Sequence, residues 1–455
     1  MTTIVLRRAS LGPDRGPVDI AVRDGVLVDP ADVPAGAEEV DLDGRPVLPG
    51  LADHHVHLFA LAAARASVDL SPEALAAGGG LDRVLVAARA RTPGGWLRGV
   101  GYDVATSGPL DRHRLDATGA GPMRVQDRTG ILWVLDGPAL AEVLPADARD
   151  VPDGVELVDG RPTGVLVRLD HWLGHRVPTP PMDLAAVGAE LAASGVVVVM
   201  DAGADNDAPD LAALAAADLP VGVAAMTRDV VARPVGSVAL GPVKVLLDDT
   251  DLPDLAALSA HVAAAHAAGR GVAVHCVSEV QLALALAAGI GPADRVEHAS
   301  MLPDGLLAAL AAAGPQVVVQ PALVWARGDR FLAETDPADH AALHRLGALR
   351  RAGVRVAASS DAPFGPVDPW RSIATAVDRR TRTGASLGPD EAVTPLEALA
   401  LHTGRVDDPA IPRRLVPGEP ADLVVLDDDW SALATHPRVA ATARAGRLTH
   451  GHWPA

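Results

Sequence analysis

Lysine is almost missing from this chain of 455 residues: 38 of its 39 basic residues are arginine, and Lys244 is the single lysine. Positive charge is scarce as a whole, because 58 acidic residues leave a formal net charge of −19. Such a charge repels phosphate backbones and anionic lipid, which argues against nucleic acid and membrane surfaces as partners. We therefore expect a small-molecule ligand.

Cysteine and long apolar segments are also rare. Cys276 is the only cysteine, which excludes an intrachain disulfide and fits a reducing compartment. The longest stretch without charge, 305–326, is interrupted by prolines and glutamines, so it does not predict a membrane span. No apolar run follows the two arginines near the N-terminus, so no secretory leader is expected. These features predict a cytoplasmic protein, which could form a homodimer.

Both ends of the chain predict short β-strands. Strand-like segments occur at Thr3–Arg8, Val18–Arg23 and Glu38–Leu42, and again at Ala421–Leu426 and Val439–Ala443, before a terminal hairpin at 446–448. Neither end has enough apolar residues for a core of its own. We expect them to combine into one small β-sandwich domain, made of residues 1–48 and 405–455.

The central segment, 49–404, alternates apolar strands with alanine- and leucine-rich helices, which predicts a parallel sheet with crossover helices. Helices are expected at 253–268, 279–288, 305–313 and 338–352. There are eight strand candidates, and eight β/α units predict an α/β fold of the (β/α)8 TIM-barrel type. The strand candidates are Leu51–His57, Val196–Asp201, Pro220–Met226, Val243–Leu247, Gly271–His275, Arg295–His298, Gln316–Gln320 and Val354–Ser360.

A long insertion separates the first two barrel strands. It covers about residues 66–182 and contains further strand candidates at 123–126, 131–135 and 164–168. It leaves the carboxyl end of the first strand, the end at which barrel enzymes hold their active sites. We therefore expect this subdomain to overhang the active site.

Histidines and an aspartate fall at the carboxyl ends of several predicted strands. His55 and His57 close the first strand, where the two-residue period of a strand puts them on one side. His275 ends the fifth strand, His298 ends the sixth, and Asp361 follows the eighth. A single histidine at a strand end is usually a packed residue, but this set at one rim predicts a divalent metal site, with zinc favoured by the imidazoles.

Lys244 lies in the apolar fourth strand, between Val243 and Val245. An amine, unlike a guanidinium, can lose its proton and react with carbon dioxide to form a carbamate, which could bridge two cations. We predict one metal ion on His55, His57 and Asp361 and a second on His275 and His298. Carboxylated Lys244 and a hydroxide would bridge the two ions, which would activate the water for hydrolysis.

Several motifs together resemble the amidohydrolase superfamily, and in particular the amidohydrolase 3 branch that includes N-substituted formamide deformylases. The resemblance covers nearly the whole chain. It implies a metal-dependent barrel, a composite β-domain and hydrolysis at a carbon that carries nitrogen, with Asp361 moving a proton from water to the leaving nitrogen. The motifs are Pro49-Gly50-Leu51-Ala52-Asp53 with His55 and His57, Val274-His275, Arg295-Val296-Glu297-His298, Ser360-Asp361-Ala362-Pro363, Gly418-Glu419-Pro420-Ala421-Asp422, and in the insertion 96–103 and 161–165.

The insertion also departs from that branch, because Asp127 stands where a histidine is common. Asp127 and Arg128 are candidate substrate-binding residues, although Asp127 could equally cap a turn or pair with Arg128. Tyr102, the only tyrosine, could donate to an oxyanion or simply pack. Arg295 and Glu297 are candidates for holding the ligand histidines in place.

Two other functions stay open at this point. A deaminase of a nucleobase-like heterocycle would use similar ligands, but it needs a glutamate three residues after His275, where Ser278 stands, and it needs no lysine. A degenerate metal-binding protein without activity is the other alternative, and the complete ligand set argues against it. The sequence favours hydrolysis of an amide, formamide or cyclic amide and does not identify the substrate.

Overall fold

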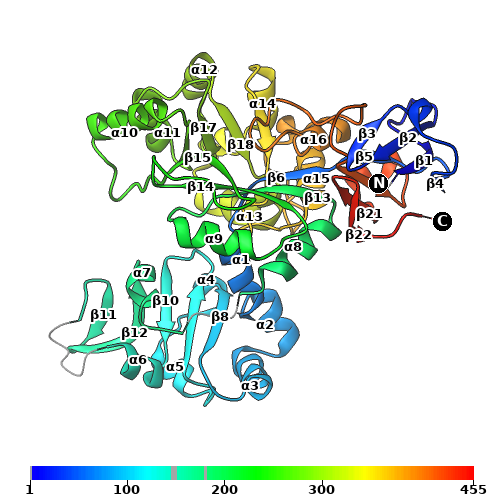
Figure 1. Cartoon of the computed structure of the whole chain (residues 1–455). Coiled ribbons are helices and arrows are strands. Elements are labelled where there is room, and N and C mark those ends of the chain that lie inside the picture. Colours follow the sequence, from blue (N-terminus) through cyan, green and yellow to red (C-terminus); the bar gives the residue numbers. More distant parts are fainter. Residues whose placement is uncertain (1–2, 145–150, 179–181, 455) are drawn as a thin grey trace. The chain divides into compact units, whose positions relative to one another are not determined.

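The computed structural model describes residues 3–144, 151–178 and 182–454. It contains two compact units (Figure 1). One unit is the insertion, Phe59–Asp183, and the other combines Met1–Leu58 with Leu184–Ala455. Each unit is described by itself below.

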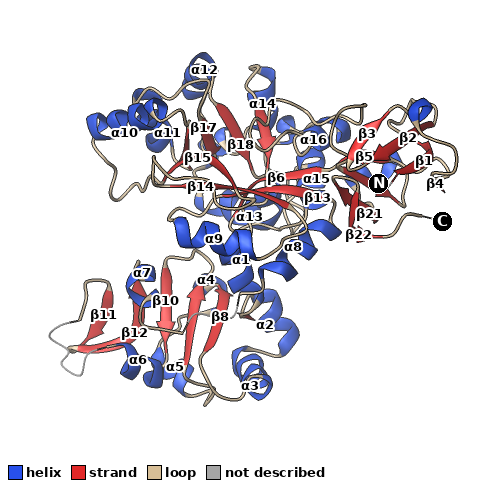
Figure 2. Cartoon of the chain, viewed as in Figure 1, coloured by secondary structure: helices blue, strands red, loops and turns tan. Residues whose placement is uncertain are grey.

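The larger unit is built on an eight-stranded parallel sheet that curls into a barrel, with helices around it (Figure 2). In sheet order the strands are β6 (Leu51–Val56), β13 (Val196–Asp201), β14 (Gly222–Thr227), β15 (Ala239–Val245), β16 (Val272–Cys276), β17 (Arg295–His298), β18 (Gln316–Val319) and β19 (Val356–Ala358). Backbone hydrogen bonds join the end of β6 to the segment that follows β19, since the amide of Asp361 donates to His55 O at 2.8 Å and the amide of His57 donates to Ala362 O at 2.9 Å. The predicted (β/α)8 fold is confirmed.

The barrel helices follow from capping residues and apolar faces in the sequence. For example, α10 (Leu255–Ala267) begins after Asp254, whose carboxylate accepts from two amides of the first turn. It buries Leu258, Val262 and Ala265, which lie on one helical face. The remaining α-helices of this unit are α8 (Leu184–Ala193), α9 (Ala208–Ala216), α11 (Glu279–Ala287), α12 (Asp304–Ala313), α13 (Pro321–Glu334), α14 (Leu346–Arg351), α15 (Pro369–Asp378) and α16 (Pro395–Ala400).

The predicted helix 338–352 is wrong as a single element. The structure has a 3₁₀ helix, Pro337–Ala342, and then α14, with His344 in the left-handed region at φ 48° between them. Tertiary pairing causes the break, because His344 N donates to Ser300 O and Leu302 N donates to Ala342 O. The helix α13 was not predicted, although Pro321 at its first position is a typical start signal.

The two termini of the chain form two four-stranded sheets that share one apolar core. The core contains Ile4, Leu6 and Val22 from the first sheet and Leu423 and Val425 from the second. The second sheet itself needs both ends of the chain, since β5 pairs with β20, and Figure 1 shows the two ends close together. The strands are β1 (Thr3–Ala9), β2 (Val18–Arg23), β3 (Val26–Val28), β4 (Glu38–Asp41), β5 (Val47–Pro49), β20 (Leu423–Leu426), β21 (Val439–Arg444) and β22 (Arg447–Gly451).

The insertion has a mixed six-stranded sheet with helices packed on it (Figure 2). Only β9, β10 and β12 of its strands were predicted. In sheet order the strands are β11 (Val155–Val158), β12 (Arg161–Val167), β10 (Leu132–Leu135), β9 (Met123–Asp127), β8 (Leu97–Tyr102) and β7 (Val68–Asp69). The helices are α1 (Leu58–Arg65), α2 (Pro72–Gly78), α3 (Leu81–Arg91), α4 (Val104–Ser107), α5 (Arg112–Asp116), α6 (Gly137–Val143) and α7 (Asp170–Gly174).

Membrane insertion gains no support from the helices. Within the three described segments, none combines the length and the apolar character that crossing a bilayer requires.

Candidate metal centre

Five of the predicted ligands come from the carboxyl ends of barrel strands. His55 is the penultimate residue of β6 and His57 follows that strand, His275 lies in β16, His298 ends β17, and Asp361 comes three residues after β19. The carboxyl ends of parallel barrel strands meet at one rim, so these side chains can converge.

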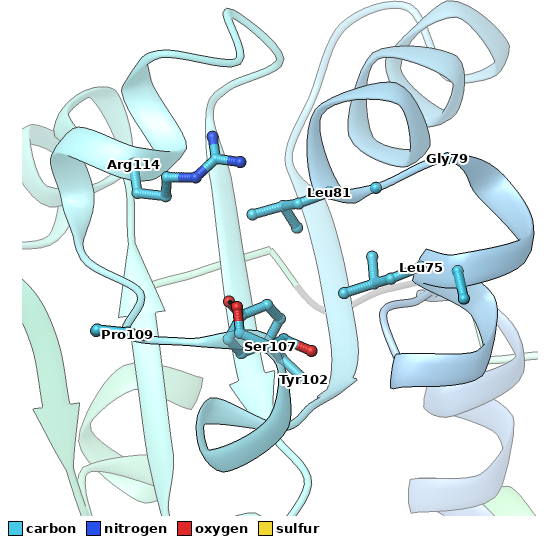
Figure 3. A pocket seen from close by; sticks show the side chains of 9 residues that line it. Leu75, Gly79, Leu81, Tyr102, Ser107, Pro109 and Arg114 are labelled. Carbon is cyan, nitrogen blue, oxygen red and sulfur yellow. Dashed lines mark hydrogen bonds between the residues drawn. The ribbon is translucent and has the colours of Figure 1, made fainter.

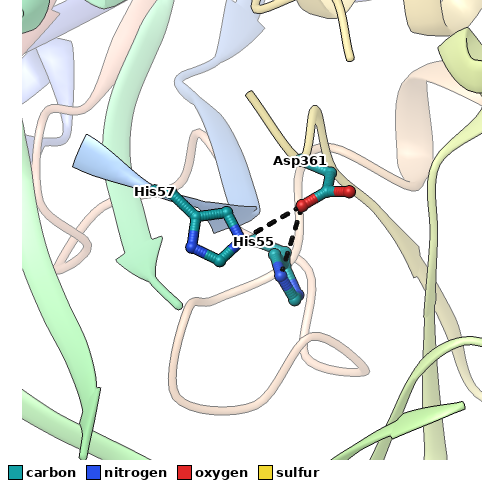
Figure 4. A group of neighbouring side chains, drawn as sticks. All are labelled: His55, His57 and Asp361. Carbon is teal, nitrogen blue, oxygen red and sulfur yellow. Dashed lines mark ion pairs between the residues drawn. The ribbon is translucent and has the colours of Figure 1, made fainter. Parts of the chain in front are cut away.

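His55, His57 and Asp361 form the tightest group (Figure 4). Asp361 Oδ1 lies 3.2 Å from His57 Nε2 and 3.5 Å from His55 Nε2. One ligand atom from each of the three residues lies within 4.8 Å of the others. Two imidazoles and one carboxylate at this spacing are a suitable ligand set for a divalent ion such as zinc.

The hydrogen bonds around His55 show why a cation fits between these groups. The other ring nitrogen, His55 Nδ1, lies 2.6 Å from Glu297 Oε2. Arg295 donates to Glu297 Oε1 at 3.0 Å, so Glu297 acts as a charged acceptor and the proton of His55 is placed on Nδ1. His55 Nε2 then carries a lone pair that faces the carboxylate of Asp361. Two acceptors opposed at 3.5 Å repel each other unless a cation lies between them.

The remaining histidines lie beside this group. The rings of His275 and His298 are 4.6 Å apart between centroids, and those of His55 and His298 are 5.2 Å apart. His55 and His298 are buried, and His275 is nearly so. The structure therefore brings all four predicted histidines and Asp361 into one cluster.

Burial favours the metal-binding protonation state of several of these groups. It lowers the pKa of His55 and His298, and it lowers that of His275 to about 3, so these imidazoles are neutral and have lone pairs to donate. Burial alone would raise the pKa of Asp361, but the hydrogen bond with His57 acts in the opposite direction, and the pKa ends well below its usual value, so the carboxylate is ionised.

Lys244 lies in β15, next to the strand of His275, and is 4% exposed. Burial lowers the pKa of its amine, while the charges of Glu297 and Asp361 act in the opposite direction. These charges place Lys244 within electrostatic range of the histidine cluster. A lowered pKa favours the neutral form of the amine, which carbamate formation requires.

The backbone is strained at two of the cluster residues. His298 has φ 77° and Asp361 has φ 54°, and neither is a glycine. Left-handed conformations of this kind cost about 1–2 kcal/mol each. Such residues gather at functional sites, where the surrounding structure holds them in place.

Some residues that support the cluster were not found from the sequence. Asp53 is buried and accepts hydrogen bonds from the amides of His55 and Ser360, which connect β6 to the segment after β19. Burial is the largest influence on the pKa of Asp53 and raises it to about 6. Gln320 pairs with His298 Nδ1 at 2.8 Å. The sequence could have pointed to Gln320 as a residue of the site, because it is a polar residue at the carboxyl end of a predicted barrel strand.

The three candidates in the insertion have local contacts. The hydroxyl of Tyr102 lies within donating distance of the carbonyls of Ser107 and Gly108, at 3.1 and 3.0 Å, and the residue lines a pocket of about 440 Å³ within this unit (Figure 3). Asp127 accepts from Thr129 Oγ1 at 2.7 Å and from the amide of Leu132. These contacts assign Tyr102 and Asp127 local structural roles, and their roles toward substrate stay predictions.

Arg128 does not pair with Asp127. Its guanidinium lies 3.3 Å from Asp103 Oδ2, across the β8–α4 junction, and its amide donates to Tyr102 O at 2.9 Å. The alternative in which Asp127 pairs with Arg128 is therefore not the arrangement in the structure. A role of Arg128 in substrate binding stays a prediction.

Comparison with known proteins identifies the family. The model of the amidohydrolase family matches residues 38–450. The chain belongs to the amidohydrolase family. N-substituted formamide deformylase of Arthrobacter pascens is 27% identical to this amidohydrolase over 474 residues, which cover 88% of this chain and 86% of that protein. The amidohydrolase assignment confirms the predicted enzyme class, which acts on carbon–nitrogen bonds other than peptide bonds.

Solved structures share the fold of this amidohydrolase. An uncharacterized metal-dependent hydrolase from Pyrococcus horikoshii has a TM-score of 0.77 at 21% identity, with 96% of this chain and 99% of that chain covered. An uncharacterized metal-dependent hydrolase from Pyrococcus furiosus has a TM-score of 0.74 at 20% identity, with 94% and 99% covered. Both matches cover the barrel, the β-domain and the insertion.

Proposed function

We propose that this amidohydrolase hydrolyses the C–N bond of a small amide, and that N-substituted formamides are the first substrate class to test. The observation that carries the proposal is the opposition of His55 Nε2 and Asp361 Oδ1 at 3.5 Å, because this pair of acceptors is arranged for a cation. The substrate class is supported by the 27% identical formamide deformylase of Arthrobacter pascens.

Two divalent ions, most suitably zinc, would be held by the cluster. His55, His57 and Asp361 would hold the first ion, and His275 and His298 the second, with carboxylated Lys244 shared between them. The neutral imidazoles favoured by burial support these ligand roles. When bound, such ions lower the pKa of a water molecule and polarise the carbonyl of the substrate.

Asp361 would be the proton carrier. Its carboxylate has Oδ1 beside His55 and His57, and the residue is buried, with 11% of the side chain exposed. In the proposed reaction it accepts a proton from the attacking water and returns it to the leaving nitrogen. The amine then departs as a neutral molecule, and the acid product is released as its anion after the second proton of the water passes to solvent.

Deamination of a heterocycle is the weaker candidate. That reaction needs a carboxylate three residues after His275, and in this position Ser278 caps α11 and donates to Asp249 Oδ1 at 2.7 Å. Glu279, one residue later, is exposed in the first turn of α11. The place of the catalytic carboxylate is thus taken by a capping serine.

The test is a substrate panel with matched metal states. Enzyme stripped by a chelator and enzyme reloaded with zinc would be assayed against N-substituted formamides, other amides, lactams and amino-heterocycles. We expect amine and formate from the formamides with the reloaded enzyme and none with the stripped enzyme. Release of ammonia from amino-heterocycles, without amide cleavage, would overturn the proposal in favour of deamination.

A further inference from the structure

Two ligand histidines are each held at Nδ1 by a buried side chain, and the two partners differ in charge. His55 Nδ1 lies 2.6 Å from Glu297 Oε2, whereas His298 Nδ1 lies 2.8 Å from Gln320 Oε1. Glu297 and Gln320 are 0% and 1% exposed, so water does not screen either contact.

Glu297 has to be a carboxylate in this place. Its Oε1 accepts from Arg295 Nε at 3.0 Å, and Arg295 Nη2 lies 2.9 Å from the same oxygen, while Oε2 accepts from His55. Two donors therefore approach its two oxygens from different sides. An amide would present an N–H to one of these donors, so a glutamine cannot satisfy both.

Gln320 has to be an amide. Its Nε2 donates to Val318 O at 3.2 Å and to Ser359 Oγ at 2.9 Å. Since a backbone carbonyl can only accept, this contact fixes the NH2 group on the Val318 side and turns Oε1 toward His298. His298 is thereby held with its proton on Nδ1 by a neutral acceptor, and its Nε2 is left as the ligand atom.

From this difference we infer that the two positions bind their metal ions with unequal affinity. Glu297 gives the position of His55, His57 and Asp361 the higher affinity. Neutral Gln320 leaves the ion at His275 and His298 exchangeable. The inference rests on the proposed function. A charged acceptor on the far nitrogen raises the basicity of an imidazole ligand, and loss of such a partner typically weakens metal binding 10- to 100-fold. Glu297 and Gln320 act through the histidines and are positioning residues.

The test is a zinc titration of the stripped full-length enzyme against a chromophoric chelator, with bound zinc counted by elemental analysis. We expect two classes of site whose dissociation constants differ at least tenfold. Glu297→Gln should weaken the tight class about 10- to 100-fold and change the weak class little. Gln320→Met, which removes only the neutral acceptor, should weaken the weak class alone and by a smaller factor.

A matched control is Glu391→Gln. Glu391 is also buried and lies near two arginines, Arg345 and Arg351, but it accepts from the amide of Ala348 and contacts none of the cluster histidines. This variant should change neither class by more than about twofold. Circular dichroism would check that all variants remain folded.

The outcomes separate the two proposals. Two zinc ions held within threefold of each other in the wild type, or equal weakening of both classes by Glu297→Gln, would overturn the inequality and leave the proposed function standing. A wild-type enzyme that binds no zinc would overturn both.

Discussion

Replacement of Asp361 by asparagine tests the centre of the proposed chemistry. The change keeps the size of the side chain and removes its charge and its capacity to carry a proton. Oδ1 lies 3.2 Å from His57 Nε2 and 3.5 Å from His55 Nε2, so the same atom is both a predicted ligand and the predicted base. Loss of a general acid–base group lowers turnover about 10²–10⁴-fold, which corresponds to about 2.7–5.4 kcal/mol of activation free energy.

The assay would follow kcat and kcat/KM on the best formamide of the panel, together with zinc content. We expect Asp361→Asn to stay folded and to lose turnover by at least the factor given above, and by more if the first ion is also lost. Asp294→Asn is the matched control, because Asp294 is a buried aspartate that precedes β17 and so lies at the opposite end of that strand from His298. Turnover within a few fold of wild type in Asp361→Asn would remove this residue from the mechanism.

Four further variants, at three positions, test other parts of the structure. Lys244→Arg should bind at least one metal ion fewer by elemental analysis and lose most activity, since a guanidinium forms no carbamate. The activity of Lys244→Ala should recover in part when short carboxylates are added. Full activity of Lys244→Arg would exclude the carbamate bridge. Asp127→Ala should lower the free energy of unfolding by about 1–2 kcal/mol, because the carboxylate accepts two hydrogen bonds in its turn, and an unchanged urea midpoint would contradict this. Burial lowers the pKa of His402 to about 4, so between pH 6.5 and 4 the unfolded chain binds a proton that the folded chain does not, and the free energy of unfolding decreases as the pH is lowered through that window. His402→Gln should reduce this loss of stability between pH 7 and 4 by about 3 kcal/mol. Parallel curves of stability against pH for the two proteins would refute it.

The fold could be predicted largely from local patterns. The apolar run Val196–Asp201 has the bounds expected for a buried parallel strand, since a strand covered on both faces is apolar nearly throughout. The prediction failed where tertiary contacts override local preference. The segment 338–352 has the composition of one helix, but the pairing of His344 with Ser300 breaks it.

The insertion was harder to predict for a related reason. Its edge strands β7 and β11 have only two and four residues and little burial, so they have weak periodic signals. The turn at Asp127 and the ion pair between Arg128 and Asp103 depend on side-chain directions that no spacing rule provides.

The sequence by itself determined which side chains gather at the barrel rim, because parallel strands bring their carboxyl ends together whatever the loops between them do. It also singled out Lys244, since only one lysine is present. Only the tertiary structure decided which nitrogen of His55 and of His298 is available as a ligand. That choice depends on partners distant in sequence, with Glu297 fixing His55 and Gln320 fixing His298, because a hydrogen bond requires a donor and an acceptor at the right distance and angle.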